Sequence, residues 1–248
     1  MDNTVYSGVD AEWILLNIGN TTTQIAARLP DGRIEIINES ATETLDLTPW
    51  RDCKLAAASV VPFWTKQLAD GGAFLVNSAH SGGLDLSCMD SSTLGADRLA
   101  NSICADREFP GKAVVVCDFG TAIDIEVLDG GHRMLGGAIM PGRKLLRQSL
   151  NRGTAQLPEL PLSNTVPEKI GYNTVSALAL GIDAGVIGSV REVLKRIQHA
   201  LGAPAVYVGI GGDAEYFLPH FAEMKYGGKD FTLRGVALSL EYELKNAR

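Results

Sequence analysis

The sequence has few of the features that mark membrane-bound or secreted proteins. No apolar run approaches the roughly 18 residues of a membrane-spanning helix. The N-terminus is acidic and lacks the basic and apolar regions of a secretion signal. Only four cysteines occur, at positions 53, 88, 104 and 117, and they include no C-x-x-C pair. Two disulfides are arithmetically possible, but reduced, mostly buried thiols in a cytoplasmic protein are the better interpretation.

Positive charge is also scarce. The formal net charge is -7 and the isoelectric point is near 5.1, which argues against a broad electrostatic attraction for nucleic acid. By contrast, 46% of the 248 residues are hydrophobic. That is enough for a sizeable core, in one large domain or in two of about 120 residues.

Familiar catalytic motifs are missing as well. The chain contains no G-x-x-x-x-G-K-[ST] loop, no H-E-x-x-H and no G-x-S-x-G. The stretch GIGGDA at 209–214 lacks the full G-x-G-x-x-G spacing of a dinucleotide site, although it could hold the adenosine end of a nucleotide.

Hydrophobic periodicity predicts strands and helices in two successive blocks of an α/β protein. The most natural boundary is PGK at 110–112, which predicts domains over 1–111 and 112–248. The predicted strands lie at 13–18, 24–29, 34–38, 54–60, 73–79, within 113–142 and at 205–210. The predicted helices lie at 62–70, 94–109, 142–151, 173–199 and 233–246.

Two stretches resemble each other across that boundary. NIGNTTTQI at 17–25 and DFGTAIDIE at 118–126 each run from an apolar strand through a glycine into small or hydroxyl residues and a second strand. Gly19 and Gly120 are 101 positions apart (120 minus 19), which favours two related halves over a solenoid. Because the match is short, chance similarity is the alternative.

Both turns have the composition of a phosphate site. A glycine lets backbone N–H groups approach an anion, and the hydroxyls of Thr21 and Thr121 add donors. Asp118, at a strand end, is placed to orient Mg²⁺ through its waters. The alternative is a pair of tight hairpins without a ligand.

A further cluster, LGADRLAN at 94–101, combines an acid and a base. Asp97 can act as a general base, and Arg98 can clamp a carboxylate or a phosphate. The alternative is that Asp97 caps a helix that begins there.

Taken together, these stretches resemble the type III pantothenate kinases, members of the acetate and sugar kinase/Hsp70/actin superfamily. Eight motifs in family order carry the resemblance, from about residue 13 to the C-terminus. They are IGNT (18–21), SVVPFWT (59–65), GADRLAN (95–101), DFGTA (118–122), GGAIMPG (136–142), TAQLP (154–158), NTVSALALG (173–181) and GIGGDA (209–214).

The resemblance implies a fold, an activity and a set of ligands. The fold is α/β, with two duplicated RNase H-like domains, each a mixed sheet with helices, and a nucleotide cleft between them. The activity is the ATP-dependent phosphorylation of pantothenate, the first step towards coenzyme A. Family members are cytoplasmic homodimers that need Mg²⁺ and a monovalent cation, K⁺ or NH₄⁺.

The resemblance also assigns roles to residues. It places Asn17, Gly19, Asn20 and Thr21 in the first phosphate loop, and Asp118, Gly120 and Thr121 in the second, with Asp118 at the metal. Asp97 matches the general base, Gly95 and Arg98 match contacts to pantothenate, and Thr174 matches a substrate contact from the other subunit. Gly211 and Gly212 match the turn on the adenosine side.

Three positions depart from the family pattern. Asn17 stands where the family has Asp, and losing one fixed charge in a water-poor site costs roughly 10²- to 10³-fold in rate. Cys88 replaces a tyrosine that closes over pantothenate. Asp124 stands where Thr-x-Asp usually continues the second loop, and it either restores part of the charge missing at Asn17 or belongs to a solvent-facing acidic strand.

These departures keep two other functions open beside an active, slower pantothenate kinase. One is a catalytically weakened paralogue that retains nucleotide binding and has an accessory role. The other is a kinase of the same fold that acts on a different small hydroxylated acceptor.

Overall fold

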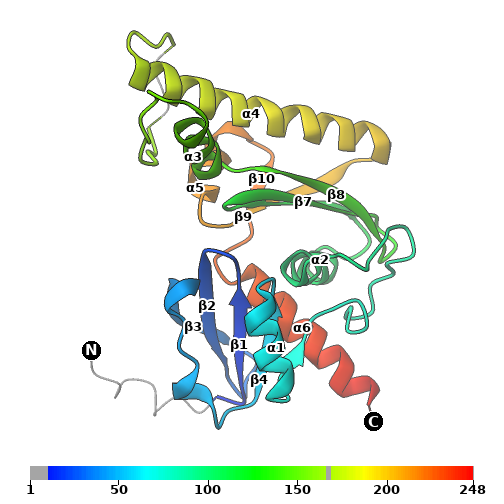
Figure 1. The fold of residues 1–248 in the computed structure, drawn as a ribbon. Helices are drawn as coiled ribbons and strands as arrows, with labels where there is room; N and C mark the ends of the chain where they lie inside the picture. The colour runs from blue at the N-terminus through cyan, green and yellow to red at the C-terminus, as the bar shows by residue number, and fades with distance from the viewer. Residues whose placement is uncertain (1–10, 166–168, 248) are drawn as a thin grey trace. The chain divides into compact units, whose positions relative to one another are not determined.

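The computed structural model describes residues 11–165 and 169–247, which divide into two compact units. The first unit comprises the chain up to Lys112, the segment Leu128–Gly136 and the C-terminal part from Gly228. The second unit comprises Ala113–Val127 and Gly137–Gly227. Figure 1 shows the elements of both units with their labels.

The first unit is built on a five-stranded sheet in the order β3-β2-β1-β4-β5. Strands β1 and β2 are antiparallel, β2 and β3 are antiparallel, and β1, β4 and β5 run parallel. The strands are β1 (Trp13–Ile18), β2 (Thr22–Arg28), β3 (Ile34–Ala41), β4 (Leu55–Ser59) and β5 (Phe74–Leu75). The helices of this unit are α1 (Pro62–Asp70), α2 (Ala96–Glu108) and α6 (Phe231–Asn246), and 3₁₀ turns lie at Thr42–Thr44 and Thr48–Trp50.

The second unit repeats this topology. Its five strands have the order β10-β9-β6-β7-β8, in which β6 pairs in parallel with β9, and β9 with β10. The strands are β6 (Ala113–Phe119), β7 (Ala122–Leu128), β8 (Met134–Pro141), β9 (Ala205–Ile210) and β10 (Met224–Tyr226), of which β7 and β8 extend into the first unit at one end. The helices are α3 (Arg143–Gly153), α4 (Thr174–Leu201) and α5 (Ala214–Phe217), followed by a 3₁₀ turn at Leu218–His220.

Written from its other edge, the second sheet has the order β8-β7-β6-β9-β10, which matches the order β3-β2-β1-β4-β5 of the first. A duplication predicts this match, and the expected fold class is confirmed. In each half three consecutive strands lie side by side, β1 to β3 in one and β6 to β8 in the other, and two parallel strands extend the other edge. The predicted strand at 73–79 is much shorter than expected, because Asn77 ends it early. The Asn77 side-chain oxygen accepts hydrogen bonds from the backbone N–H groups of Ala79 and His80 and forms a turn.

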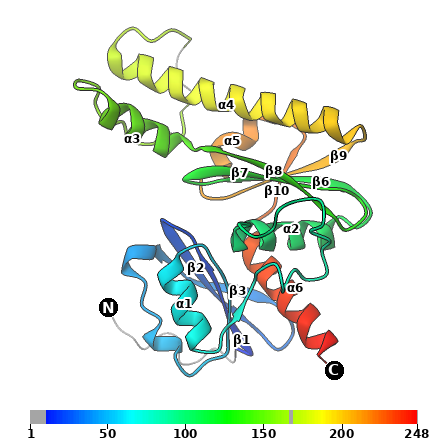
Figure 2. The same ribbon diagram turned by 45° about the vertical axis from the view of Figure 1, so that its right-hand side comes forward.

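The units do not follow the predicted division into 1–111 and 112–248. The predicted boundary lies at one crossing between units, but helix α6, at the far end of the chain, packs on α2, β1 and β4 of the first unit (Figure 2). The two helices approach so closely that a Cβ at Gly235 would lie 1.9 Å from the carbonyl oxygen of Ala100. Asn101 accepts a hydrogen bond from Thr232 at 2.7 Å across the same contact.

The two faces of strand β1 have different neighbours. Ile14, Leu16 and Ile18 pack with Trp50 and with Leu68 of α1 in one apolar cluster. Side chains alternate along a strand, so Leu15 and Asn17 point to the opposite face. Helix α6 contacts β1 and β4, and α2 contacts β4. Asn17 is therefore a polar residue within the central strand of a covered sheet.

In the second unit, the long helix α4 covers the sheet. Ile182, Val186 and Val190 of α4 pack on a cluster that includes Phe119 and Ile125 of the sheet. Phe119 also stacks on Phe217 of α5, with ring centroids 4.2 Å apart. This packing joins the carboxyl end of β6 to α5 and to the cluster under α4.

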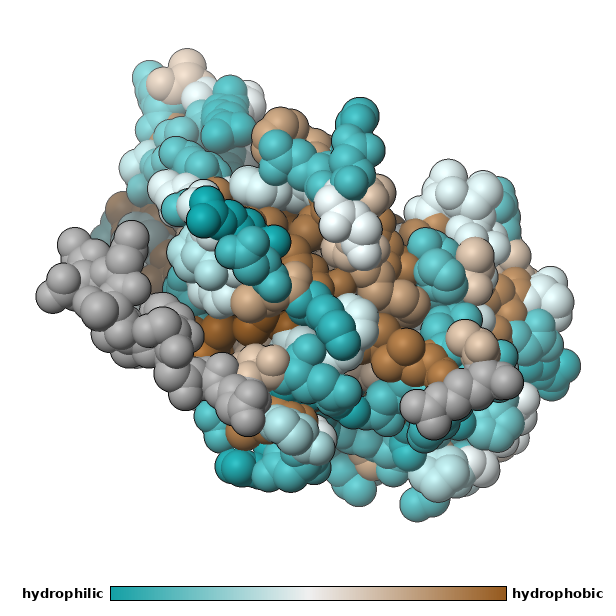
Figure 3. All heavy atoms as spheres, turned by 90° about the horizontal axis from the view of Figure 1, so that it is seen from below, coloured by the Kyte–Doolittle hydropathy of each residue, from teal (hydrophilic) through white to brown (hydrophobic). Residues whose placement is uncertain are grey.

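Three features bear on the expectations drawn from the composition: the surface, the helices and the cysteines. Apolar residues reach the surface among polar ones on the face drawn in Figure 3. Within the described ranges, none of the helices combines the length and apolar character that a membrane span requires. All four cysteines are free, but only Cys104 and Cys117 are buried, so the expectation of mostly buried thiols is met by half of them.

Candidate active site

In the first unit, the predicted site residues meet at the carboxyl edge of two parallel strands. Strand β1 ends at Ile18, whose carbonyl accepts a hydrogen bond from the backbone N–H of Val60 at 3.1 Å. A Cβ at Gly95 would lie 3.6 Å from Cγ1 of the same valine. The turn that follows β1 and the start of α2 therefore share one edge, although they are far apart in the sequence.

The first predicted phosphate loop is a tight, supported turn. The backbone N–H of Gly19 donates to the carbonyl of Thr22 at 3.0 Å, and Asn20 and Thr21 are exposed. Thr42, the first residue after β3, supports the turn, because its hydroxyl donates to the carbonyl of Gly19 at 2.7 Å and its N–H donates to the carbonyl of Thr21. No local sequence motif marks Thr42, so only the structure reveals its contact with this turn.

Asp97 lies in the first turn of helix α2 but is not its N-cap residue. Gly95 occupies the N-cap position of α2. The alternative that Asp97 is the cap of this helix is therefore wrong. Asp97 is the second helical residue, and its Oδ1 accepts from the backbone N–H of Arg98 at 2.7 Å. Burial raises the pKa of the Asp97 carboxyl above its ordinary value, although Arg98 acts in the opposite direction. A partly desolvated carboxylate is suited to accept a proton.

In the second unit, the second predicted phosphate loop is packed against the start of α3. The N–H of Gly142 donates to the carbonyl of Thr121 at 3.0 Å, and Gly142 is the N-cap of α3. A Cβ at Gly142 would lie 2.3 Å from the carbonyl oxygen of Gly120. The glycine at the end of GGAIMPG therefore serves close packing and the start of a helix.

The turn at Gly211 and Gly212, which the resemblance places on the adenosine side, lies against Asp118. Gly211 follows β9, has a φ of +91°, and would place a Cβ 2.4 Å from Oδ1 of Asp118. Only glycine adopts this conformation without strain and lets the backbone come this close to Asp118. Gly212, by contrast, has no atom within 4 Å of a Cβ position. The structure thus brings together Asp118, Gly120, Thr121 and Gly211, which parallel pairing of β6 with β9 makes possible.

A buried ion network that the sequence analysis missed supports this turn. Arg143 is 0% exposed, and its Nε lies 2.9 Å from Oδ2 of Asp213, which directly follows Gly212. Arg147 pairs with the buried Asp183 of α4 at 2.9 Å. The Arg143 guanidinium also lies 3.4 Å from the centre of the Tyr216 ring. Buried charges need such partners, so the network links the turn to α3 and α4.

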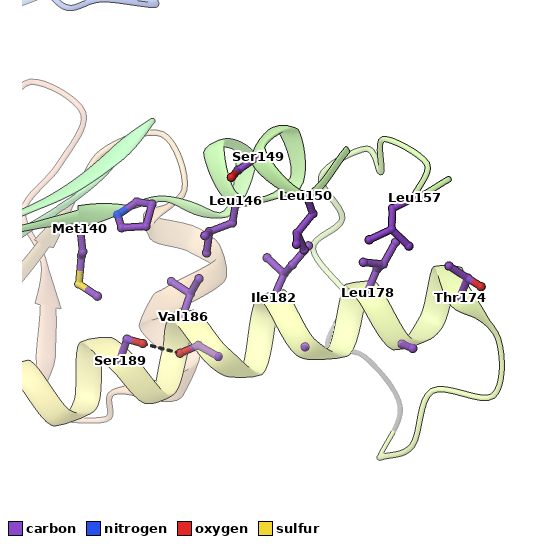
Figure 4. A pocket seen from close by; sticks show the side chains of 14 residues that line it. Met140, Leu146, Ser149, Leu150, Leu157, Thr174, Leu178, Ile182, Val186 and Ser189 are labelled. Carbon is purple, nitrogen blue, oxygen red and sulfur yellow. Dashed lines mark hydrogen bonds between the residues drawn. The ribbon is translucent and has the colours of Figure 1, made fainter. Parts of the chain in front are cut away.

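Thr174 occupies a different place in the second unit. It is the first residue of α4 and lines a groove of about 740 Å³ between α3 and α4. Figure 4 shows Leu146 and Leu150 of α3 facing Ile182 and Val186 of α4, with Thr174 at the far end. The groove is mostly apolar, and it does not involve the turns at Asp118 and Gly211.

The acidic residues of β7 do not form the solvent-facing strand that was one interpretation of Asp124. Glu126 is 0% exposed and Asp124 is half-buried, so this strand does not face solvent along its length. The hypothesis that Asp124 compensates for Asn17 stays a prediction.

The residues present are compatible with a magnesium–nucleotide complex. Among residues 11–165 and 169–247, no three His, Cys, Asp or Glu side chains form a metal cluster. Mg²⁺ bound to nucleotide phosphates keeps several waters and needs only one or two carboxylates. In the second unit, the Asp118 carboxylate would provide one such ligand. Within the first unit, Asn17 Oδ1 is a buried acceptor that receives no hydrogen bond from the described residues.

The close contact at Gly211 yields a test. Gly211→Ala is expected to reduce the stability of the protein by about 2 kcal/mol or more, because φ is positive and the new Cβ meets Asp118 and Phe119. The measurement is urea unfolding without nucleotide.

Gly212→Ala is the matched control. Its Cβ meets no atom within 4 Å, so its unfolding free energy should stay within about 0.5 kcal/mol of the wild type. Equal stability of the two variants would contradict the crowded geometry at Gly211.

Comparisons with known proteins agree with this architecture. The family model for "Type III pantothenate kinase" matches residues 13–196. A type III pantothenate kinase from Legionella pneumophila is 30% identical over 223 residues, which cover 86% of this chain and 85% of the relative.

Two solved structures are similar in fold. A Baf family protein from Campylobacter jejuni superposes with a TM-score of 0.63 at 19% identity, covering 94% of this chain and 99% of the other. MreB5 of Spiroplasma citri, bound to ADP, superposes with a TM-score of 0.50 at 10% identity, covering 95% and 96%. Because the family model matches residues 13–196, more than half of the chain, and the Legionella relative is 30% identical over 86% of it, this chain belongs to the type III pantothenate kinase family.

Proposed function

We propose that this protein transfers the γ-phosphoryl group of ATP to the hydroxyl of pantothenate. The observation that carries the proposal is the family match over residues 13–196, a range that contains Gly95, Asp97 and Arg98. The comparisons give no support to an accessory role or to another acceptor.

In the proposed reaction, Asp97 accepts the proton of the substrate hydroxyl as the hydroxyl attacks the phosphoryl group. Arg98, the next residue, binds the pantothenate carboxylate, and the backbone at Gly95 contacts the substrate. The support is their common position at the start of α2, together with the raised pKa of Asp97. A base whose pKa approaches the working pH transfers protons more effectively.

The two glycine turns bind the phosphates in this proposal. Gly19, Asn20 and Thr21 form the first turn, and Gly120 and Thr121 form the second. Asp118 would hold Mg²⁺, which neutralises charge on the transferring group, and Gly211 and Gly212 would contact the adenosine. Positioning and electrostatic stabilisation account for most of the catalysis in phosphoryl transfer.

Two finer features belong to the same proposal. The enzyme uses a monovalent cation, K⁺ or NH₄⁺, and it acts in the cytoplasm. The four free cysteines are compatible with a reducing compartment.

We further propose a homodimer in which Thr174 reaches the substrate of the partner subunit. The support is the apolar groove that Thr174 lines and the apolar residues near it. Ile170 is 79% exposed, Tyr172 is 81% exposed and Val175 is 53% exposed. A patch of this kind favours burial against another surface.

The activity is tested by coupled ADP release from the purified protein with Mg²⁺, ATP and K⁺. Release should depend on pantothenate, and Na⁺ in place of K⁺ should lower it. ATP binding without pantothenate-dependent release would instead select the accessory role. Release that depends on another hydroxyl compound would select a different acceptor.

Asp97→Asn separates catalysis from stability. The variant should lose at least about 10²-fold in turnover, because an amide cannot accept the proton. Since the folded-state pKa of Asp97 is raised, its contribution to stability is present below pH 3.8 and is lost as the pH rises through that pKa. At neutral pH the variant should therefore be as stable as the wild type or more stable, as urea unfolding would report. Unchanged turnover would remove Asp97 from the role of base.

Leu178→Glu tests the dimer. Leu178 lines the groove on α4, and a buried carboxylate there should dissociate the subunits and reduce turnover. Light scattering after size exclusion measures the mass, and Lys195→Glu, at an exposed position of the same helix, is the control. A wild-type protein that is monomeric at micromolar concentration would overturn the dimer proposal.

A further inference from the structure

The amide at position 17 belongs to a row of polar side chains that crosses three strands. Asn17 on β1 is paired with Gln24 on β2, and Gln24 is paired with Glu39 on β3. Residues paired across neighbouring strands point to the same face of the sheet. The three side chains therefore form a continuous row, which ends at Glu39 on the exposed edge strand.

Hydrogen bonds in the row define the orientation of Gln24. Its Nε2 donates to Oε2 of Glu39 at 3.1 Å and to the carbonyl of Lys229 at 3.2 Å. Both partners can only accept, because one is a carboxylate and the other a backbone carbonyl. The nitrogen of Gln24 must face them, and its oxygen Oε1 must face Asn17.

That orientation determines the orientation of Asn17 in turn. Asn17 Nδ2 donates to Oε1 of Gln24 over a long 3.5 Å, so Oδ1 points away from β2. On the other side of β1, the residue paired with Asn17 is Ala58, whose small side chain leaves room. Oδ1 is buried and receives no hydrogen bond from the described residues. A buried acceptor without a donor destabilises the folded protein, and a hydrogen bond from a ligand would remove that penalty.

Asn17 is the second-last residue of β1 and lies two residues before Gly19, so its amide is held at the edge of the sheet that carries the predicted first phosphate loop. Strand β4 continues from Ala58 to Ser59 and is followed by Val60, whose N–H donates to the carbonyl of Ile18 at the end of β1 and whose Cγ1 would lie 3.6 Å from a Cβ at Gly95. A carbonyl oxygen held at this edge can accept a hydrogen bond from a metal-bound water, although it supplies no charge.

We propose that Gln24 is a positioning residue, backed by Glu39, that presents Oδ1 of Asn17 as an acceptor to the hydrated Mg²⁺ of bound ATP. The neutral amide at position 17 then performs the hydrogen-bonding part of a carboxylate's task. This inference rests on the proposed function because it requires Mg·ATP to bind. It does not require pantothenate to be the compound that is phosphorylated.

The first experiment measures nucleotide affinity by titration calorimetry, so it does not depend on turnover. Gln24→Met should weaken Mg·ATP binding about tenfold, because the Asn17 amide is then free to rotate. Binding of ATP in EDTA should change little. Gln67→Met, the same substitution at an exposed position of α1, should change neither affinity.

A double-mutant cycle tests the orientation itself. In Asn17→Asp, both carboxylate oxygens are acceptors, so one meets Oε1 of Gln24 unless Gln24 reverses and gives up its bonds to Glu39 and Lys229. Glu39→Gln permits that reversal, since its amide can donate. The effect of Asn17→Asp on Mg·ATP affinity should therefore be about fivefold more favourable in the Glu39→Gln background.

The outcomes separate this inference from the proposed function. Additive effects in the cycle, or equal losses with and without Mg²⁺ in Gln24→Met, would overturn the role of Gln24 even if pantothenate-dependent turnover is normal. Conversely, if the wild type shows no pantothenate-dependent turnover but the coupling is present, the positioning role stands and the acceptor assignment fails.

Discussion

Parallel pairing of the central strands is the constraint on which the candidate site depends. In the first unit β1 pairs in parallel with β4, and in the second unit β6 pairs in parallel with β9. Parallel strands end at the same edge, so the segments that follow them meet even when they are distant in the sequence. In each unit this edge carries a glycine turn and a second segment, which begins at Gly95 in one and at Gly211 in the other.

Close approach at these edges requires both missing side chains and buried charge. Gly211 and Gly142 lie where a Cβ would collide with backbone or with Asp118. The turn at Gly211 is also supported by the ion pair between Arg143 and Asp213. The attraction between the two charges offsets the free-energy cost of removing both side chains from water. Burial raises the pKa of the Asp213 carboxyl, while Arg143 lowers it, so the pair is coupled to the packing of α3.

The distribution of charge at the first-unit edge reflects a compromise between stability and chemistry. Burial that raises the pKa of Asp97 destabilises the folded protein at neutral pH, yet it makes the carboxylate a better base. Asn17 avoids a second buried charge nearby, and its buried Oδ1 retains the capacity to accept a hydrogen bond.

Local patterns determined much of this protein. Hydrophobic periodicity located most strands and helices, the repeated glycine turns indicated two related halves, and LGADRLAN marked Asp97 and Arg98, since each of these signals lies within a few neighbouring residues. Only the tertiary structure decided that α6 joins the first unit, that Arg143 supports the turn at Gly211, and that Gln24 and Glu39 orient Asn17. Those contacts join residues from separate elements, and the chain must fold before either partner has an environment that reveals its role.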